Sequence, residues 1–466
     1  MSDTRTTSLC PQCLRRLPAA VVRRGDEVWL ERTCPEHGEV RALVWRGPPG
    51  YDEWRRAGTG PSCCDPAENP DCPTACGLCE SHVRQTCCVL LEVTARCDLE
   101  CPICFASARR GSPADPSIDE IEGWYRRLLE LAPGCNVQLS GGEPTVRDDL
   151  PQVIALGRSL GLSYLQLNTN GLRLAADEGY AETLAAAGLQ TVFLQFDGVD
   201  DAAHLALRGR SLAALKERAV EHCAAAGLGV VLVPTVVRGV NLDQLGRILA
   251  FGLERLPAVR GIHLQPLALL GRYPDAHAAA GDAAARVTLP EVMRELAAQS
   301  AGSILLEDLT PGDCEHALCS FSREYFHAAD GALVPLRRDV AESCGCGASA
   351  GPGGRTLRST DKAAHVARRW SAPSTSCRDA AEVPDDQWGD ILRQVRANTF
   401  SVSAMAFQDA WTIDLERLRH CYLHVLAPDG RFVPFCAYNL TGADGRGLGV
   451  GRRSERSGSR LGERAQ

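Results

Sequence analysis

Three closely spaced cysteines give the chain its clearest chemical feature. Cys97, Cys101 and Cys104 lie in the segment Cys-Asp-Leu-Glu-Cys-Pro-Ile-Cys. Thiolate ligands select iron–sulfur clusters or zinc over hard cations, and a 4Fe–4S cluster normally takes four of them. A loop that supplies three leaves one iron open to a molecule that is not protein. Three unrelated cysteines or a zinc knuckle are the alternatives that the motif alone leaves open.

A second motif, Ser140-Gly-Gly-Glu-Pro144, follows about one strand and one helix later. Gly141 and Gly142 let a backbone come close to a ligand, and the carboxylate of Glu143 can bind an ammonium group. Alone, such a sequence is typical of a turn. Its place one strand–helix unit after the three-cysteine loop favours a binding role.

Polar residues also stand where the later strands of the predicted core end. Such residues line a pocket, although Asn-Gly and Asp-Gly are also good turns. The candidates for contact with a cofactor or substrate are Asn168, Asn170, Gln195 and Asp197, followed by His263 and Gln265.

A further metal site is predicted near the N-terminus. Cys10, Cys13, Cys34 and His37 form a C-x2-C…C-x2-H set, which suits a tetrahedral zinc knuckle or a rubredoxin-like mononuclear iron site. His37 is the expected fourth ligand, with Cys63 or Cys64 as alternatives.

The remaining clustered cysteines predict auxiliary centres. Cys72, Cys76 and Cys79 form a second three-cysteine loop, which a nearby thiol (Cys63, Cys64, Cys87 or Cys88) could complete as an electron-transfer cluster. A second zinc site is the alternative. Another cluster is expected if the C-terminal part folds back against the core; its candidate ligands are Cys314, Cys319, Cys421 and Cys436.

The elements that must position these residues alternate between short apolar runs and amphipathic segments. Such alternation predicts an α/β fold with a parallel sheet, in which sites lie at the carboxyl ends of the strands. Periodicity alone does not distinguish an open sheet from a closed barrel. The expected strands are 88–94, 136–140, 163–168, 191–196, 229–236 and 261–265, and the expected helices lie near 117–131, 148–160, 177–187, 210–226 and 241–256.

Composition narrows the class of protein further. The chain has 466 residues, 45% of them hydrophobic, and a net charge of −8, which argues against a broad nucleic-acid surface. We find no signal peptide and no apolar run long enough for a transmembrane segment. A cytoplasmic location is therefore expected, where the 22 cysteines more often bind metal than form disulfides.

The two central motifs resemble the signature of the radical S-adenosylmethionine (SAM) superfamily. That resemblance implies a partial (βα)6 TIM-like barrel, in which the open iron of a 4Fe–4S cluster binds SAM and the Gly-Gly-Glu motif holds its amino group. The flanking cysteines and the block Arg419–Asn439 look like the branch of class D methylases (pterin dimethyltransferases) and tetraether-lipid synthases. The resemblance covers about 10–110, 136–272 and 400–441, whereas 335–395 matches no pattern of that branch.

The resemblance also suggests a division of the chain into parts. The barrel is flanked by small N-terminal metal-binding segments and a C-terminal auxiliary-cluster domain. The expected parts are a rubredoxin- or zinc-ribbon-like domain (1–60), a cysteine-rich cluster loop (61–87), the barrel (88–270), a barrel extension (271–342), a flexible Gly/Ser/Ala-rich segment (343–383), the cluster domain (384–441) and a disordered tail (442–466).

The implied reaction is reductive cleavage of SAM to a 5′-deoxyadenosyl radical, which abstracts hydrogen from an unactivated carbon of a small molecule. An external donor of the flavodoxin or ferredoxin type would supply the electron. Three interpretations remain: C–C bond formation of the methylation type, coupling of lipid chains, and an iron–sulfur redox or assembly protein without SAM turnover. A lipid substrate requires a long apolar tunnel, whereas a pterin site requires polar and aromatic walls.

Overall fold

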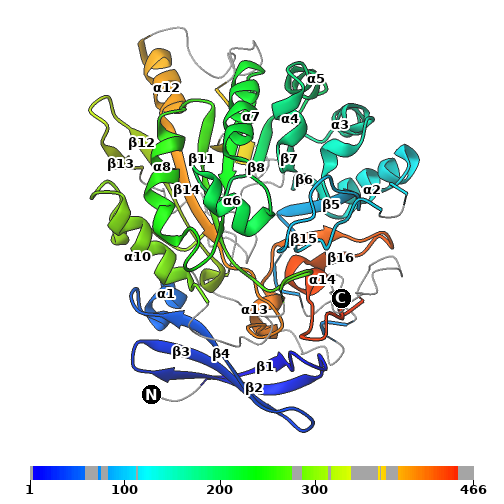
Figure 1. Cartoon of the computed structure of the whole chain (residues 1–466), viewed down its shortest axis with the longest axis vertical. Coiled ribbons are helices and arrows are strands. Elements are labelled where there is room, and N and C mark those ends of the chain that lie inside the picture. Colours follow the sequence, from blue (N-terminus) through cyan, green and yellow to red (C-terminus); the bar gives the residue numbers. More distant parts are fainter. Residues whose placement is uncertain are drawn as a thin grey trace, which may run out of the picture.

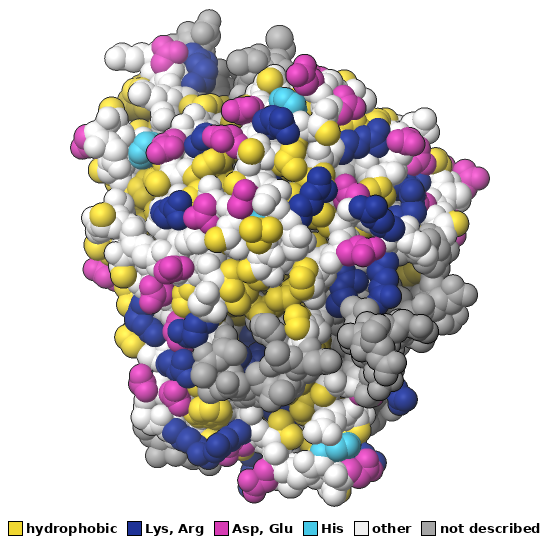
Figure 2. Space-filling model, viewed as in Figure 1, with side chains coloured by type: hydrophobic (Ala, Val, Ile, Leu, Met, Phe, Trp, Pro, Cys, Tyr) yellow, Lys and Arg dark blue, Asp and Glu magenta, His cyan; other side chains and the backbone are white. Residues whose placement is uncertain are grey.

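The protein consists of a small antiparallel sheet beneath a large, curved, mostly parallel sheet (Figure 1). A computed structural model of the chain describes residues 4–57, 72–74, 82–84, 86–111, 114–274, 286–312, 316–336, 366–367, 369–373 and 387–449. On the face shown in Figure 2, the described basic and acidic side chains are interspersed. Among the helices of these described residues, none has the length and apolar character needed to cross a bilayer.

The small sheet has four strands in the order β1-β2-β3-β4. Its hairpins place two turns side by side at one end of the sheet, and these turns carry the N-terminal cysteines. The strands are β1 (Thr4–Leu9), β2 (Arg16–Arg24), β3 (Glu27–Cys34) and β4 (Gly38–Arg46), followed by the short helix α1 (Tyr51–Ala57).

This small sheet is fixed to the rest of the molecule by buried polar contacts. The guanidinium of Arg32, which is only 4% exposed, donates to the carbonyls of Leu9 (2.8 Å) and Ala410 (3.0 Å). Ser8 Oγ donates to the carbonyl of Ile413 at 2.6 Å. A buried guanidinium is costly unless it is hydrogen-bonded, so these contacts specify where the sheet docks.

The large sheet supplies the barrel. Its order is β13-β12-β14-β11-β9-β8-β7-β6-β5-β15-β16, with β10 paired to β11. Neighbouring strands from β15 through β5 to β14 run parallel, and β12, β13 and β16 are antiparallel additions. The central strands are β5 (Cys88–Thr94), β6 (Asn136–Gly141), β7 (Leu165–Thr169), β8 (Thr191–Gln195), β9 (Gly229–Val233), β10 (Thr235–Val236) and β11 (Val259–Pro266).

Helices cover the outer face of this sheet, and their amphipathic patterns explain why. In α2 the buried side chains Ile121, Tyr125 and Leu128 share one face, and a capping box between Ser117 and Glu120 starts the helix. The helices are α2 (Ile118–Leu131), α3 (Leu150–Ser159), α4 (Leu172–Ala176), α5 (Tyr180–Ala186), α6 (Asp201–Arg208), α7 (Ala213–Ala225), α8 (Leu245–Leu253), α10 (Leu289–Gln299) and α12 (Gln387–Ala397). The predicted α/β class with a partial barrel is confirmed.

The C-terminal part of the chain joins the barrel sheet, which the sequence did not predict. Strand β14 pairs with β11, and β15 pairs with β5. The ranges 88–270, 271–342 and 384–441, expected as separate parts, therefore contribute strands to one sheet. These added elements are β12 (Ser320–His327), β13 (Leu333–Pro335), β14 (Thr399–Met405), α13 (Leu415–Arg419), β15 (Leu423–Leu426), β16 (Phe432–Pro434) and α14 (Phe435–Asn439).

One piece of the predicted flexible segment packs against the amino ends of the strands. Trp370 is 7% exposed and lies in an apolar cluster with Tyr164 and Val231. A Cβ added at Gly261 would come within 2.9 Å of the Trp370 ring, and one at Gly229 within 2.1 Å of its carbonyl oxygen. Glycines at the two strands thus allow Trp370 to approach the barrel floor.

Candidate active site

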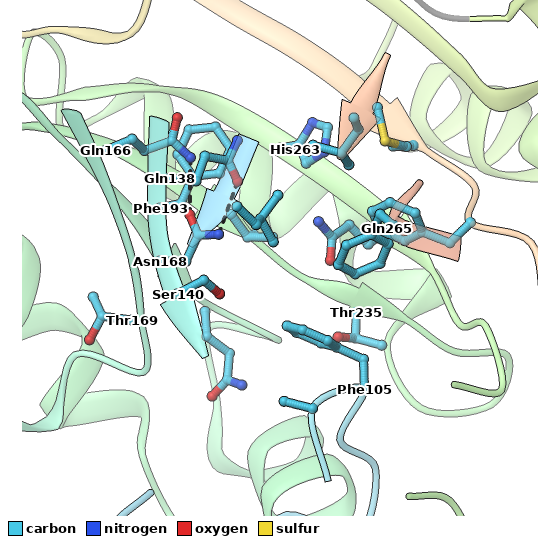
Figure 3. Close-up of a pocket in the computed structure, with 18 of the residues that line it drawn as sticks. Phe105, Gln138, Ser140, Gln166, Asn168, Thr169, Phe193, Thr235, His263 and Gln265 are labelled. Atoms are coloured by element: carbon cyan, nitrogen blue, oxygen red, sulfur yellow. Dashed lines mark hydrogen bonds between the residues drawn. The ribbon is translucent and has the colours of Figure 1, made fainter. Parts of the chain in front are cut away.

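The candidate active site is a cavity of about 380 Å³ inside the barrel. Its lining includes Cys97, Cys101 and Cys104, which lie in the loop after β5. Of the predicted contact residues, the cavity is also lined by Gly141, Gly142, Glu143, Asn168, Asn170, Gln195, His263 and Gln265 (Figure 3). Asp197 is not among the residues that line it.

The three-cysteine loop is held by its own backbone and by Arg272. The backbone N–H and carbonyl of Cys104 pair with those of Arg272, each at 2.8 Å, and the Arg272 guanidinium donates to the carbonyl of Cys101 at 2.9 Å. Burial raises the pKa of the Cys97 and Cys101 thiols. Buried thiols of this kind become thiolates only with a positive partner, so the donor set fits an iron–sulfur cluster.

The glycines of the second motif let two strand ends meet. A Cβ at Gly141 would lie 2.1 Å from the carbonyl oxygen of Thr94, and one at Gly142 would lie 2.0 Å from that of Arg96. The N–H groups of Gly142 and Glu143 donate to those same carbonyls at 2.7 and 2.8 Å. The motif is thereby anchored directly beside the chain that leads into Cys97.

Glu143 is buried and holds the end of β7. Its carboxylate accepts from Thr145 Oγ1 (2.7 Å), Thr169 Oγ1 (2.6 Å) and the backbone N–H of Asn170 (2.6 Å). Burial raises its pKa, and these donors oppose that rise. Asn170 in turn donates to Asp98 Oδ1 at 2.7 Å, which ties the end of β7 to the three-cysteine loop.

Arg208, at the end of α6, is a cavity residue that the sequence analysis missed. Its guanidinium lines the cavity and forms a paired contact with Asp197, at 2.7 Å from Nε and 2.8 Å from Nη2. Burial lowers the pKa of Arg208, but the nearby Asp197 carboxylate raises it. The second effect is larger, so the pKa lies above its usual value. Asp197 therefore contacts Arg208 rather than the cavity. A buried Asp needs a counter-ion, and a search of the sequence for that counter-ion could have revealed Arg208.

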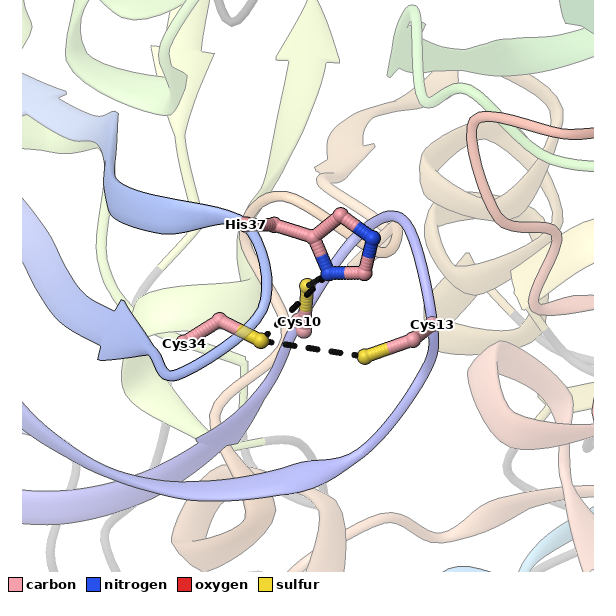
Figure 4. A group of neighbouring side chains, drawn as sticks. All are labelled: Cys10, Cys13, Cys34 and His37. Atoms are coloured by element: carbon pink, nitrogen blue, oxygen red, sulfur yellow. Dashed lines mark hydrogen bonds between the residues drawn. The ribbon is translucent and has the colours of Figure 1, made fainter.

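The predicted N-terminal ligands converge at the turns of the small sheet (Figure 4). One ligand atom from each of Cys10, Cys13, Cys34 and His37 lies within 4.8 Å of the other three. His37 Nδ1 is 3.6 Å from Cys10 Sγ and 3.4 Å from Cys34 Sγ. This donor set fits a tetrahedral metal ion.

Comparison with known proteins gives the chain a family. The description "Radical SAM superfamily" matches residues 91–252, and "HMPTM N-terminal zinc ribbon domain" matches residues 3–46. The 7,8-dihydro-6-hydroxymethylpterin dimethyltransferase of Methanocaldococcus jannaschii is 33% identical over 478 residues, which span 94% of this chain and 93% of that protein. The chain belongs to the radical SAM superfamily.

Other relatives match only part of this radical SAM enzyme. A probable GTP 3′,8-cyclase of Methanothermobacter thermautotrophicus is 27% identical over 40% of this chain and 60% of its own. Among solved structures, Streptococcus suis SuiB with a precursor peptide is 17% identical with a TM-score of 0.35, covering 40% of each chain. The enzyme anSMEcpe with bound AdoMet is 19% identical with a TM-score of 0.36, covering 46% of this chain and 59% of its own.

The radical SAM enzyme also brings together three of the thiols predicted for an auxiliary centre. The Arg417 guanidinium donates to Cys319 Sγ at 3.1 Å. Burial and the neighbouring Cys319 thiol raise the pKa of Cys421 to about 12, and burial together with the Cys421 and Cys319 thiols raises the pKa of Cys436. Cys72 packs against the same apolar cluster as Cys421 and Cys436. The predicted partners Cys76, Cys79 and Cys314 lie outside the described residues.

Proposed function

We propose that this radical SAM enzyme forms a C–C bond of the methylation type at an unactivated carbon of a pterin-like small molecule. The observation that carries the proposal is the match to a pterin dimethyltransferase over 94% of this chain and 93% of that relative. The cavity supports it, because amides such as Gln138 and Asn168 line it together with the aromatic ring of Phe193. Coupling of lipid chains would call for a long apolar tunnel instead.

In this proposal Cys97, Cys101 and Cys104 hold the 4Fe–4S cluster beside the cavity. When bound, the cluster and SAM supply a 5′-deoxyadenosyl radical that abstracts hydrogen from a carbon. The protein excludes water from that cavity and holds the reactants within it. A zinc or iron ion on Cys10, Cys13, Cys34 and His37 would stabilise the small sheet.

The cofactor-binding residues divide into contacting and positioning groups. The backbone of Gly141, Gly142 and Glu143 faces the cavity and is suited to hold the SAM amino group. Arg208 offers the positive charge that a SAM carboxylate requires, and Asp197 orients Arg208. Asn170 and Gln195 supply further polar contacts from the ends of β7 and β8.

An auxiliary cluster on Cys319, Cys421 and Cys436 would stand next to the same cavity. Phe435, the neighbour of Cys436, packs on Phe105 with ring centroids 5.4 Å apart, and Phe105 follows Cys104. Cys88 belongs to the same apolar cluster as Cys436, and Cys72 packs against it; Cys76 and Cys79, which lie outside the described residues, remain candidates from the sequence. Such a centre would pass an electron between an external donor of the ferredoxin or flavodoxin type and the cavity.

The test combines metal counting with product analysis. Anaerobically reconstituted protein supplied with SAM, dithionite and a one-carbon donor of the reduced-folate class should release 5′-deoxyadenosine and convert 7,8-dihydro-6-hydroxymethylpterin to methylated products. A variant with Ala at positions 97, 101 and 104 should lose about four irons and all SAM cleavage while keeping its other metal. SAM cleavage without any methylated pterin would contradict the pterin substrate. No cleavage at all would favour an iron–sulfur protein of another function.

A further inference from the structure

Four side-chain amides form one hydrogen-bonded chain along the inner faces of β6 and β7. Gln166 Nε2 donates to Asn168 Oδ1 (3.0 Å), Asn168 Nδ2 to Gln138 Oε1 (3.0 Å), and Asn136 Nδ2 to Gln166 Oε1 (3.4 Å). All four side chains line the cavity, because alternate residues of a strand face the same side. We call Asn136, Gln138, Gln166 and Asn168 the amide ladder; Figure 3 shows Gln138, Gln166 and Asn168 on one side of the cavity.

The ladder does not satisfy its own members. Asn136 is 6% exposed, and its Oδ1 has no hydrogen-bond partner among the described residues. Gln138 contributes only its oxygen to the ladder, although its amide nitrogen can donate twice. A buried polar atom without a partner costs about 1–3 kcal/mol. The group that a polar ligand in the cavity can reach is the amide nitrogen of the partly exposed Gln138, because Asn136 Oδ1 has almost no accessible surface.

Flat and aromatic side chains border the cavity at the same depth. The rings of Phe193 and His263 have centroids 5.9 Å apart, and Phe193 meets Trp370 edge-on at 5.7 Å. His263 Nδ1 lies 2.9 Å from Ser403 Oγ, and burial lowers the His263 pKa to about 4, so the ring is neutral near pH 7. This surrounding suits an uncharged planar ring with polar edges.

The ladder runs along the cavity from the amino end of β6 toward the three-cysteine loop, since Asn168 follows Leu167, which pairs with Leu139. Asn136 begins β6 and Gly141 ends it, so the two ends are on the order of 15 Å apart along the strand. Trp370 packs near the amino ends of β9 and β11, at Gly229 and Gly261. A molecule bound to the ladder thus has one edge at the closed end and its opposite edge directed toward Cys97, Cys101 and Cys104.

We propose that the amide ladder binds the lactam and amino edge of a pterin-like heterocycle and so orients its carbon-bearing edge toward the three-cysteine loop; this rests on the proposed function. A side-chain amide carries a donor and an acceptor side by side, as a lactam does, and amides read nucleobase edges in pairs by the same chemistry. A hydrocarbon chain has no hydrogen-bond donor or acceptor for these amide groups. Sites with buried polar groups reject molecules that leave them unpaired.

The experiment measures binding of 7,8-dihydro-6-hydroxymethylpterin to the full chain with its clusters in place. The variants are Asn168→Leu, which removes a ladder member at similar size, and Gln138→Glu. Glu at position 138 keeps the oxygen that accepts from Asn168, so the ladder itself is retained, but it replaces the free donor with an acceptor. Gln190→Leu is the matched control, because Gln190 bonds the start of β7 (Leu165 N–H, 3.0 Å) and is not among the cavity residues.

We expect both ladder variants to bind the pterin about tenfold more weakly or worse, and Gln190→Leu to bind it like the wild type. Iron content should not change in any of them, and SAM binding should not change in Gln138→Glu or Gln190→Leu. The number of 5′-deoxyadenosine molecules released per methylated product should rise in the ladder variants, because a misoriented substrate uncouples cleavage from transfer.

Each outcome separates the two proposals. Wild-type pterin binding with unchanged binding in both ladder variants would overturn the ladder's role and leave the proposed function standing. Absence of pterin binding in the wild type, with SAM cleavage intact, would overturn both. Loss of iron in Asn168→Leu would mark a folding defect, and Gln138→Glu then decides.

Discussion

At the scale of single residues, the closest backbone contact in the site is made possible by Gly142. A side chain there would collide with the carbonyl of Arg96, one residue before Cys97, because the added Cβ would be only 2.0 Å away. To remove this collision, either the Gly-Gly-Glu motif or the chain that leads to the cluster loop would have to move. The residue therefore couples two binding motifs that lie on different strands.

We predict that Gly142→Ala abolishes SAM cleavage and lowers the free energy of unfolding by on the order of 1–3 kcal/mol. The matched control is Gly123→Ala in α2, where an added Cβ meets nothing within 4 Å. It should stabilise the protein by about 0.5–1 kcal/mol through helix propensity and leave cleavage unchanged. Urea denaturation and 5′-deoxyadenosine release measure both. Normal cleavage in Gly142→Ala would contradict the geometry.

A second prediction concerns the paired contact between Arg208 and Asp197. A lysine at position 208 keeps the charge but cannot bond both carboxylate oxygens at once. Arg208→Lys should raise the KM for SAM about tenfold, as expected for the loss of a charge-assisted contact. Arg247→Lys is the control, because Arg247 pairs with Asp200 on the surface, where its side chain is 58% exposed. Equal KM values in the two variants would remove Arg208 from the SAM site.

At the scale of elements, the small N-terminal sheet is organised around its metal ligands. Burial raises the pKa of the Cys34 thiol, but backbone N–H groups of Glu36 and His37 together with the His37 ring lower it to about 6. A thiolate is therefore available near neutral pH for a metal ion. Among the described residues, the apolar cluster at the two turns consists of Leu17 with the ligands Cys10 and Cys34, so the ion should contribute directly to the stability of this end of the sheet.

We predict that Cys13→Ala removes about one equivalent of zinc or iron and exposes the small sheet to limited proteolysis. The iron of the SAM cluster should be retained, because its ligands lie on the loop after β5. Cys223→Ala, a buried thiol of α7 away from both sites, should keep the full metal content. Metal analysis by mass spectrometry distinguishes them, and loss of cluster iron in Cys13→Ala would contradict independent sites.

The elements also show what sequence patterns can predict. Most strands from β5 to β11 are short, largely apolar runs, and β6 and β7 alternate apolar residues with amides. Because these runs end in polar turns, their existence and order were predictable, and with them the edge where the motifs meet. Strands β14 and β15 were not, because Thr399–Met405 mixes serines with apolar residues and Leu423–Leu426 is very short. Their place is decided by pairing with distant strands. Asp197 was assigned to the pocket for a related reason, since only the folded chain reveals Arg208 beside it.

At the scale of the whole molecule, a buried ion pair joins segments far apart in the chain. The guanidinium of Arg286 contacts the Asp409 carboxylate at 2.9 and 3.1 Å, and the same carboxylate accepts from the backbone N–H of Leu269 at 2.9 Å. Burial raises the pKa of Asp409, but Arg286 and the hydrogen bonds outweigh it and leave the pKa below its usual value. The end of β11, the start of the α10 region and the segment after β14 are thereby held together.

This pair predicts acid sensitivity of the whole fold. Because the folded pKa of Asp409 lies below the unfolded value of about 3.9, its stabilisation is fully present above that pH and is lost as the pH falls below it. Asp409→Asn should cost on the order of 3–5 kcal/mol near pH 7, since it leaves Arg286 buried without its partner. Urea midpoints at pH 7 and pH 3.5 measure this, with Asp390→Asn as the control, because the Asp390 side chain is 76% exposed. A similar loss of stability in both variants would contradict the proposed contribution of the Arg286–Asp409 ion pair.

The pairing of β5 with β15 has a consequence for how the enzyme is made. Cys88 of β5 stands opposite Leu423 of β15, so the strand that leads to the cluster loop gains its outer neighbour from a segment that lies far along the chain. Until that pairing forms, Cys97, Cys101 and Cys104 belong to an incomplete sheet with an open edge, and folding through such distant contacts is slow. We therefore expect cluster insertion to follow the pairing of β15 with β5, after which the three thiols lie beside a completed sheet edge.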